Sequence, residues 1–183
     1  MTTTKARNFA AQTRLQTPLG PLLLAATDSG LAGAWFDGQA HHPGALEAPT
    51  DPAHPHLARA GSELKDYFAG QRRHFTVPLD AAGTAFQRAV WSALLEIGAG
   101  ATSSYGAIAR RIGRPLAVRA VGAAVGRNPL SIIVPCHRVV GADGSLTGYA
   151  GGLDRKQSLL QREGALAQDS LPIQADAGLH ENA

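Results

Sequence analysis

The sequence predicts an α+β fold, in which a strand-rich first part precedes a mostly helical second part with a helix-turn-helix. Apolar runs separated by turn residues dominate positions 13–37, a pattern typical of β-hairpins. Between positions 84 and 126 the apolar residues instead recur at helical spacing and are interrupted by glycines. We therefore expect an α+β domain over residues 1–80, a helical domain over residues 81–164 and a disordered tail over residues 165–183.

Composition places the chain among ordinary globular proteins. Its 183 residues, 44% of them hydrophobic and 17% charged, are enough to bury a real core. No apolar run approaches the ~20 residues that cross a bilayer, and the N-terminus lacks the apolar segment of a secretory signal. A single cysteine, Cys136, excludes an internal disulfide or a cysteine-based zinc cage. We expect a cytoplasmic protein that does not bind membranes.

In the first part, residues 15–28 and 31–37 read as β structure joined by the turn Asp-Ser-Gly. A helix is expected over 57–69, and the alternation in residues 73–80 predicts a further strand. The segment 41–56 between them is rich in proline and histidine. We interpret its histidines as loop residues and expect no metal site there; they are His41, His42, His54 and His56.

The second part carries clear helix signals. Thr84 and Gln87 form a capping-box pattern, in which each side chain satisfies a free backbone N–H of the first turn. Ser104 can cap a short helix over 105–112, and Pro115 stands where a first helical residue is allowed, so a second helix is expected over 115–126. Two short helices joined by a brief turn predict a helix-turn-helix. A final helix is expected over 153–163.

Positive charge is concentrated around this pair of helices. No acidic residue lies between Glu96 and Asp143, whereas six arginines do: Arg110, Arg111, Arg114, Arg119, Arg127 and Arg138. Such a block is either a solvated basic face or a surface suited to phosphates. The expected helix 115–126 has mostly small side chains, with Arg119 as its one long polar residue inside. Its small residues either pack on the core or allow the helix to approach the narrow minor groove of DNA closely. In the second case the helix would read little of the base sequence.

Cys136 has two interpretations at this point. A lone cysteine in an apolar run is more often inert and buried than reactive. The apolar residues 132–134 predict a stiff strand, which Pro135 ends just before the thiol, and His137 and Arg138 bring donors and positive charge beside it. Glu163 stands in the last turn of the final helix, where the helix dipole disfavours a carboxylate. It is either an exposed glutamate or a group that orients a histidine.

Several motifs, which follow one another along the chain, resemble those of a known family and favour a reactive Cys136. "RAVGAAVGRNP", "PCHRV", "GYAGG" and "LLQREG" occupy residues 119–129, 135–139, 148–152 and 159–164. The region from Thr84 to Gly164 resembles the O6-alkylguanine-DNA alkyltransferases, specifically those of the bacterial type. The resemblance implies a ribonuclease-H-like first domain and a winged-helix-like second domain.

The resemblance also implies a catalytic group of four residues. Cys136 would be the alkyl acceptor, and His137 would take the thiol proton through a water molecule. Glu163 would orient His137, and Asn128 would organise the turn between the recognition helix and the segment that carries the cysteine.

Further residues would bind the substrate. Tyr105 would contact the extruded base and help to protonate guanine as it leaves, and Arg119 would fill the space left in the duplex. The carbonyl of Val139 and the loop Tyr149, Ala150 and Gly151 would line the guanine pocket. Some relatives have serine where this chain has Ala150, so here only the backbone N–H could bind O6.

The expected function is repair of double-stranded DNA through its minor groove. A base must be flipped out before a sulfur can reach its alkyl group. The alkyl group of O6-alkylguanine, and of O4-alkylthymine, would move irreversibly to Cys136, so each protein molecule would react once. No cofactor or metal is expected. The protein would act as a monomer that could cooperate with neighbouring molecules on DNA. One alternative is a damage sensor that binds alkylated bases without repair; another, a cysteine hydrolase, would need an oxyanion hole that no motif suggests.

Overall fold

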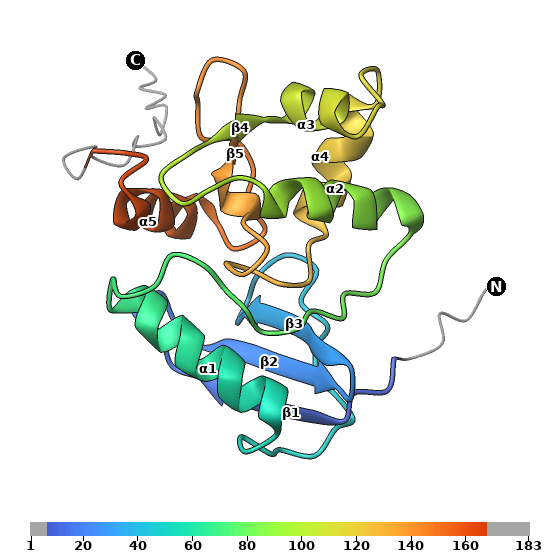
Figure 1. Ribbon diagram of the computed structural model, residues 1–183, viewed down its shortest axis with the longest axis vertical. Coiled ribbons are helices and arrows are strands. Elements are labelled where there is room, and N and C mark those ends of the chain that lie inside the picture. The colour runs from blue at the N-terminus through green and yellow to red at the C-terminus, as the bar shows by residue number, and fades with distance from the viewer. Residues whose placement is uncertain (1–6, 168–183) are drawn as a thin grey trace, which may run out of the picture.

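A three-stranded antiparallel sheet, in the order β1-β2-β3, lies at the centre of the first part (Figure 1). The computed structural model describes residues 7–167. The strands are β1 (Ala11–Leu15), β2 (Leu22–Thr27) and β3 (Gly30–Phe36). The predicted β structure and the tight turn between β2 and β3 are therefore confirmed.

Helix α1 (Pro55–Phe68) crosses one face of this sheet (Figure 1). Its buried side chains Leu57, Ala60 and Leu64 belong to the same cluster as Leu24 of β2. On the opposite face, Trp35 packs in a second cluster, with Leu23, Ala25, Phe9 and Leu46. Burial on both faces explains why β2 and β3 read as continuous apolar runs rather than as alternating patterns.

The strand predicted over residues 73–80 is wrong. The segment touches β3 only around Leu31, whose N–H donates to the carbonyl of Pro78 and whose carbonyl accepts from Asp80. Pro78 has no N–H to extend a ladder. The backbone N–H groups of Thr76 and Val77 donate instead to the buried carboxylate of Glu63, at 2.8 and 3.2 Å. A side chain from α1 thus takes the donors that a neighbouring strand would have used.

The helix signals of the second part are largely confirmed. Helix α2 (Ala85–Leu95) begins with the predicted capping box, because the N–H of Gln87 donates to the Thr84 hydroxyl and the N–H of Thr84 donates to the Gln87 side chain. The Ser104 hydroxyl caps α3 (Tyr105–Arg111) by accepting from Ala107 at 3.1 Å. Helix α5 (Leu153–Glu163) has its predicted bounds.

Helix α4 (Val118–Gly126) begins three residues later than predicted. Pro115 and Leu116 form a turn, which is closed by a hydrogen bond from the N–H of Ala117 to the carbonyl of Arg114. The indole N–H of Trp91 on α2 donates to the carbonyl of Ala124, which fixes α4 in place. The connection between the two helices is therefore longer than the expected turn.

The predicted strand over residues 132–134 is also wrong. The N–H of Val134 donates to the carbonyl of Leu130, and Ile132 has a φ of 73°, which is strained for a β-branched residue. After this turn, residues Cys136–Arg138 form the short 3-10 helix η1. The segment then joins β5 (Val139–Val140), which pairs in parallel with β4 (Ser103–Ser104). The cysteine therefore lies at the start of a helical turn.

The two parts of the chain are joined at the edge of the sheet. Ala34 of β3 exchanges two backbone hydrogen bonds with the segment that leads to the cysteine, from its N–H to Pro129 and from Ser131 to its carbonyl. One continuous buried cluster contains residues of both parts. The α+β class is confirmed, whereas a domain boundary near residue 80 stays a prediction. The predicted tail covers residues 165–183, of which residues 168–183 lie outside the described residues.

Candidate active site

The thiol of Cys136 is buried, with 4% of the residue exposed. The side-chain amide of Asn128 donates to the sulfur at 3.1 Å and to the carbonyl of Val134 at 2.8 Å. The amide oxygen of Asn128 accepts from the N–H of Leu130 at 2.9 Å. One buried amide therefore holds both ends of the strained turn and the sulfur that follows it.

Burial keeps this thiol protonated. Desolvation raises the pKa of Cys136, and the hydrogen bond from Asn128 and the positive charge of Lys156 offset it only in part. Arg138 was expected to place its charge beside the sulfur, but its guanidinium points to Glu163. The resting cysteine is therefore a neutral thiol that needs a base to react.

His137 is that nearby base, and it is fully buried. Its Nε2 lies 2.8 Å from a carboxylate oxygen of Glu163. Among residues 7–167, Nδ1 of this ring has no hydrogen-bond partner. If Nε2–H donates to the carboxylate, Nδ1 carries the free lone pair, which is the form that can accept a proton.

Glu163 also accepts from two other side chains. Arg138 donates to both of its oxygens at 2.9 Å, and the hydroxyl of Tyr67 on α1 donates at 2.8 Å. Arg138 is fixed further by donating to the carbonyl of Ile97. These donors compensate a carboxylate at the C-terminal end of α5, where the helix dipole opposes negative charge.

The charges of this group set the state of His137. Burial alone would raise the pKa of Glu163, but the hydrogen bonds from His137 and Arg138 outweigh burial and lower it to about 2. Burial lowers the pKa of His137, and this effect, together with the positive charges of Arg138 and Lys156, outweighs Glu163, whose hydrogen bond and charge raise it. At neutral pH the pair is therefore a carboxylate and a neutral imidazole.

Cys136 lines one wall of a pocket of about 230 Å³. Tyr105, Tyr149 and Ala150, all named from the sequence, line the same pocket. The other lining residues are Ala40, His41, Gly122, Val125, Gly126 and Gly148. The hydroxyl of Tyr105, at the start of α3, donates to the carbonyl of Thr147 at 3.2 Å and so connects the pocket to the glycine-rich loop.

Two residues expected at the pocket do not line it. Gly151 is buried against the rings of Tyr149 and Phe36. The carbonyl of Val139 accepts from the ammonium of Lys156, which also donates to Thr147 and Gly148. Lys156 is fully buried, and burial lowers its pKa to about 8. Its role is to hold the loop that forms one wall of the pocket.

Arg119 lies apart from these contacts, in the first turn of α4, with its side chain exposed. Val118 beside it and Leu116 in the preceding turn are also exposed, Leu116 completely. Gly122 and Gly126 of the same helix face the pocket. Helix α4 therefore presents an arginine outward and small residues toward the pocket that contains the cysteine.

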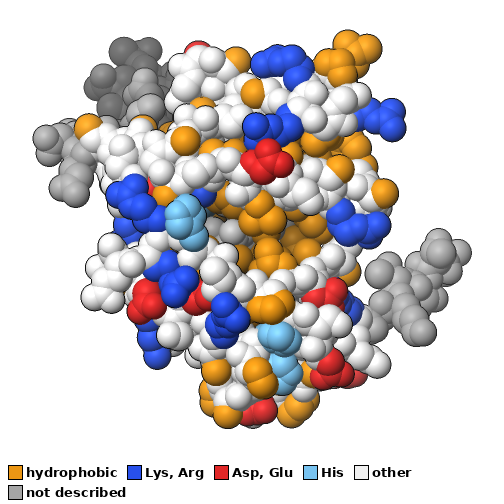
Figure 2. Space-filling model, in the orientation of Figure 1, with side chains coloured by type: hydrophobic (Ala, Val, Ile, Leu, Met, Phe, Trp, Pro, Cys, Tyr) orange, Lys and Arg blue, Asp and Glu red, His pale blue; other side chains and the backbone are white. Residues whose placement is uncertain are grey.

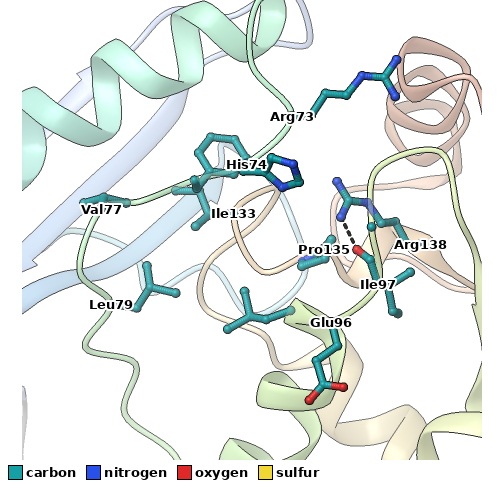
Figure 3. Close-up of a pocket in the computed structure, with 12 residues that line it drawn as sticks. Arg73, His74, Val77, Leu79, Glu96, Ile97, Ile133, Pro135 and Arg138 are labelled. Carbon is teal, nitrogen blue, oxygen red and sulfur yellow. Dashed lines mark hydrogen bonds between the residues drawn. The ribbon is translucent and has the colours of Figure 1, made fainter.

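A second pocket, of about 270 Å³, is lined in part by Ile133, Pro135 and Arg138 of the segment that carries the cysteine. On the face drawn in Figure 2, apolar side chains line a hollow between the two parts of the molecule, with basic side chains around it. Figure 3 shows Arg73 and His74 above this pocket and Ile133, Pro135 and Arg138 along it. Cys136 does not line this pocket, so we place the chemistry in the first one.

The rings of His54 and His56 pack against each other with their centroids 5.6 Å apart, whereas His41 and His42 make other contacts. His41 lies at the pocket, His42 packs against Trp35, and His56 in α1 contacts the carbonyl of Asp28. Within residues 7–167, no group of three or more His, Cys, Asp or Glu residues could hold a metal ion. In the same residues no helix is long and apolar enough to cross a membrane.

Sequence reasoning missed three contributors to the site: Tyr67, Lys156 and His41. Tyr67 and Lys156 sit in ordinary helical patterns, and His41 sits in a loop. Their partners are distant in the sequence, since Tyr67 bonds a residue 96 positions away. No local signal could have found them.

Comparison with known proteins agrees with this geometry. Two family models match the chain: "6-O-methylguanine DNA methyltransferase, ribonuclease-like domain" over residues 12–81, and "6-O-methylguanine DNA methyltransferase, DNA binding domain" over residues 85–165. The methylated-DNA–protein-cysteine methyltransferase of Mycobacterium tuberculosis is 47% identical over 159 residues, covering 87% of this chain and 95% of that protein. The protein of the same name from Methanosarcina acetivorans is 48% identical over 153 residues, covering 82% and 96%.

A solved structure is similar over the same range. The crystal structure of Mycobacterium tuberculosis OGT in complex with DNA superposes with a TM-score of 0.78 at 46% identity. The match covers 85% of this chain and 93% of that one.

The hydroxyl of Tyr67 should stabilise the charged carboxylate of Glu163. A buried hydrogen bond to a charged group contributes about 1.5–3 kcal/mol, so we expect Tyr67→Phe to lower the free energy of unfolding by about that amount. Urea unfolding at pH 7 measures the loss. In a Glu163→Gln background the same change should cost less, because the acceptor is neutral. An equal loss in both backgrounds would mean that the hydroxyl acts elsewhere.

Proposed function

Because this chain belongs to the 6-O-methylguanine DNA methyltransferase family, we propose that it repairs DNA by moving an alkyl group from O6-alkylguanine to Cys136. The observation that carries the proposal is a buried neutral thiol, held by Asn128 at the wall of a pocket and followed in the sequence by His137, whose imidazole is neutral. The transfer would occur once per molecule, since a thioether does not return the alkyl group.

The chemical step follows from the charges of the site. The sulfur of Cys136 forms a bond to the alkyl carbon while that carbon breaks its bond to guanine O6. The thiol proton passes to Nδ1 of His137 through one water molecule, and Glu163 stabilises the imidazolium that forms. The electron pair of the broken bond stays with guanine, which takes a proton from the hydroxyl of Tyr105 as this hydroxyl leaves the carbonyl of Thr147. The phenolate of Tyr105 and the imidazolium of His137 then return to their neutral forms by exchange of a proton with solvent. The alkyl donor is the DNA itself, so the step uses no cofactor.

The proposed substrate is double-stranded DNA approached through the minor groove. The arginines around α3 and α4 supply positive charge for phosphates, and α4 has the small residues that close approach requires. The target nucleotide would be flipped into the pocket, with Arg119 in the gap it leaves and the backbone N–H of Ala150 toward O6. Binding of this kind depends little on sequence, and O4-alkylthymine fits the same chemistry.

We further propose that the protein acts as a monomer in the bacterial cytoplasm, where its DNA substrate lies, and that neighbouring molecules can cooperate along the duplex. The division into an α+β domain up to residue 80 and a DNA-binding domain from residue 81 belongs to the same proposal. It is supported by the place of Cys136 and α4, which both lie in the second part.

Intact mass tests the transfer directly. After incubation with a duplex that contains one O6-methylguanine, the protein should gain the mass of one methyl group, located at Cys136, and the duplex should contain guanine. Cys136→Ser should show no gain while it still binds the duplex. Tight binding of the wild-type protein without a mass change would favour the damage sensor, and repeated turnover would favour a hydrolase.

We expect Arg119 to affect the rate of transfer from duplex DNA but not the rate of the chemical step itself. We expect Arg119→Ala to slow methyl transfer from the duplex by about tenfold or more, as the loss of an inserted side chain that offsets unstacking predicts. Its reaction with free O6-benzylguanine should stay within about twofold of wild type, since no duplex is opened. Arg14→Ala, an exposed arginine on β1, serves as the control. An equal slowing with both substrates would contradict this role.

A further inference from the structure

One wall of the pocket comes from the other part of the chain. Ala40 and His41, in the loop after β3, line the same pocket as Cys136. The N–H of Ala40 donates to the carbonyl of Ala150 at 2.9 Å. This bond holds His41 next to the loop whose backbone is proposed to receive guanine O6.

The loop that carries His41 is fixed from both sides. The side-chain oxygen of the buried Gln39 accepts from the N–H of Phe36 at 2.7 Å and from the hydroxyl of Ser131 at 3.0 Å. His41 itself has a φ of 60°, in the left-handed region that favours glycine. A residue other than glycine persists in this region only where the surrounding contacts determine the backbone. His41 is therefore held in place at the pocket.

His41 is also the least constrained of the large side chains around the pocket. The small lining residues of α4 and of the glycine-rich loop leave three bulky rings: Tyr105, Tyr149 and His41. Tyr105 is bonded to Thr147, and the hydroxyl of Tyr149 is buried. The imidazole of His41 is exposed and has no hydrogen-bond or ion-pair partner among residues 7–167.

We propose that His41 determines which alkyl groups the protein accepts; this inference rests on the proposed function. The alkyl group must lie between the sulfur and O6, so any part larger than methyl extends toward the walls of the pocket. The wall from α4 has no side chain larger than valine, and the two tyrosines border the pocket elsewhere. On the remaining wall His41 is the one large side chain, and because its backbone is fixed, the size of its ring limits the space there. His41 thus gives the first part of the chain a direct role in substrate selection.

The test compares two duplexes that differ only in the lesion, one with O6-methylguanine and one with O6-benzylguanine. The measured quantity is the ratio of the transfer rate constants, benzyl over methyl, from intact mass on full-length protein. His41→Gly removes the ring and adopts the left-handed backbone without strain. We expect it to raise the ratio by about tenfold or more, the low end of the discrimination that one methylene produces in an apolar pocket. His41→Trp should lower the ratio.

His74→Ala is the matched control, because His74 is exposed but lines the second pocket. Its ratio should equal that of the wild type. An unchanged ratio in both His41 variants, with normal transfer by the wild type, would overturn this inference alone, even if both rates fell together. No transfer by the wild type from either duplex would overturn the proposed function, and this inference with it.

Discussion

The buried carboxylate of Glu163 is the constraint on which the rest of the site depends. It ends α5, yet it accepts from His137 and Arg138 of η1 and from Tyr67 of α1. A carboxylate at a helix C-terminus is unfavourable unless such donors surround it. Placing them there brings the first part of the chain, the cysteine segment and the last helix to one point. The positions of His137, Arg138 and Tyr67 in the candidate site therefore follow from the need to compensate the buried charge of Glu163.

The same charge explains how a thiol can be both protected and reactive. Burial raises the pKa of Cys136, so the sulfur stays protonated while no substrate is bound. Arg138 neutralises Glu163, and burial then keeps His137 uncharged and able to accept a proton. Asn128 holds the sulfur at the pocket through a turn that contains the strained Ile132. Such a site is consistent with the proposed function, in which the single cysteine of the chain is alkylated once and irreversibly.

Local signals predicted most of the helices, and side chains that bind the backbone account for the two wrong strands. The capping box at Thr84, the cap at Ser104 and the bounds of α5 follow from a few neighbouring residues, so the sequence reveals them. The expected strand over 73–80 is absent because the side chain of Glu63, in the preceding helix, binds the backbone there. The expected strand over 132–134 is absent because the nearby side chain of Asn128 closes a turn there. The family motifs named most of the pocket, whereas its wall from Ala40 and His41 depends on how the two parts meet.

The pH dependence of transfer tests the central claim, that neutral His137 takes the proton of a neutral thiol. Free O6-benzylguanine is the appropriate substrate, because its reaction does not depend on DNA binding. The rate constant should be nearly level above neutral pH and fall in acid, with a midpoint below the ordinary histidine pKa of about 6.5. That midpoint marks protonation of His137, whose pKa burial lowers. A rate that instead climbs about tenfold per pH unit from pH 6 to 9 would indicate a thiolate formed by solvent hydroxide and would contradict this account.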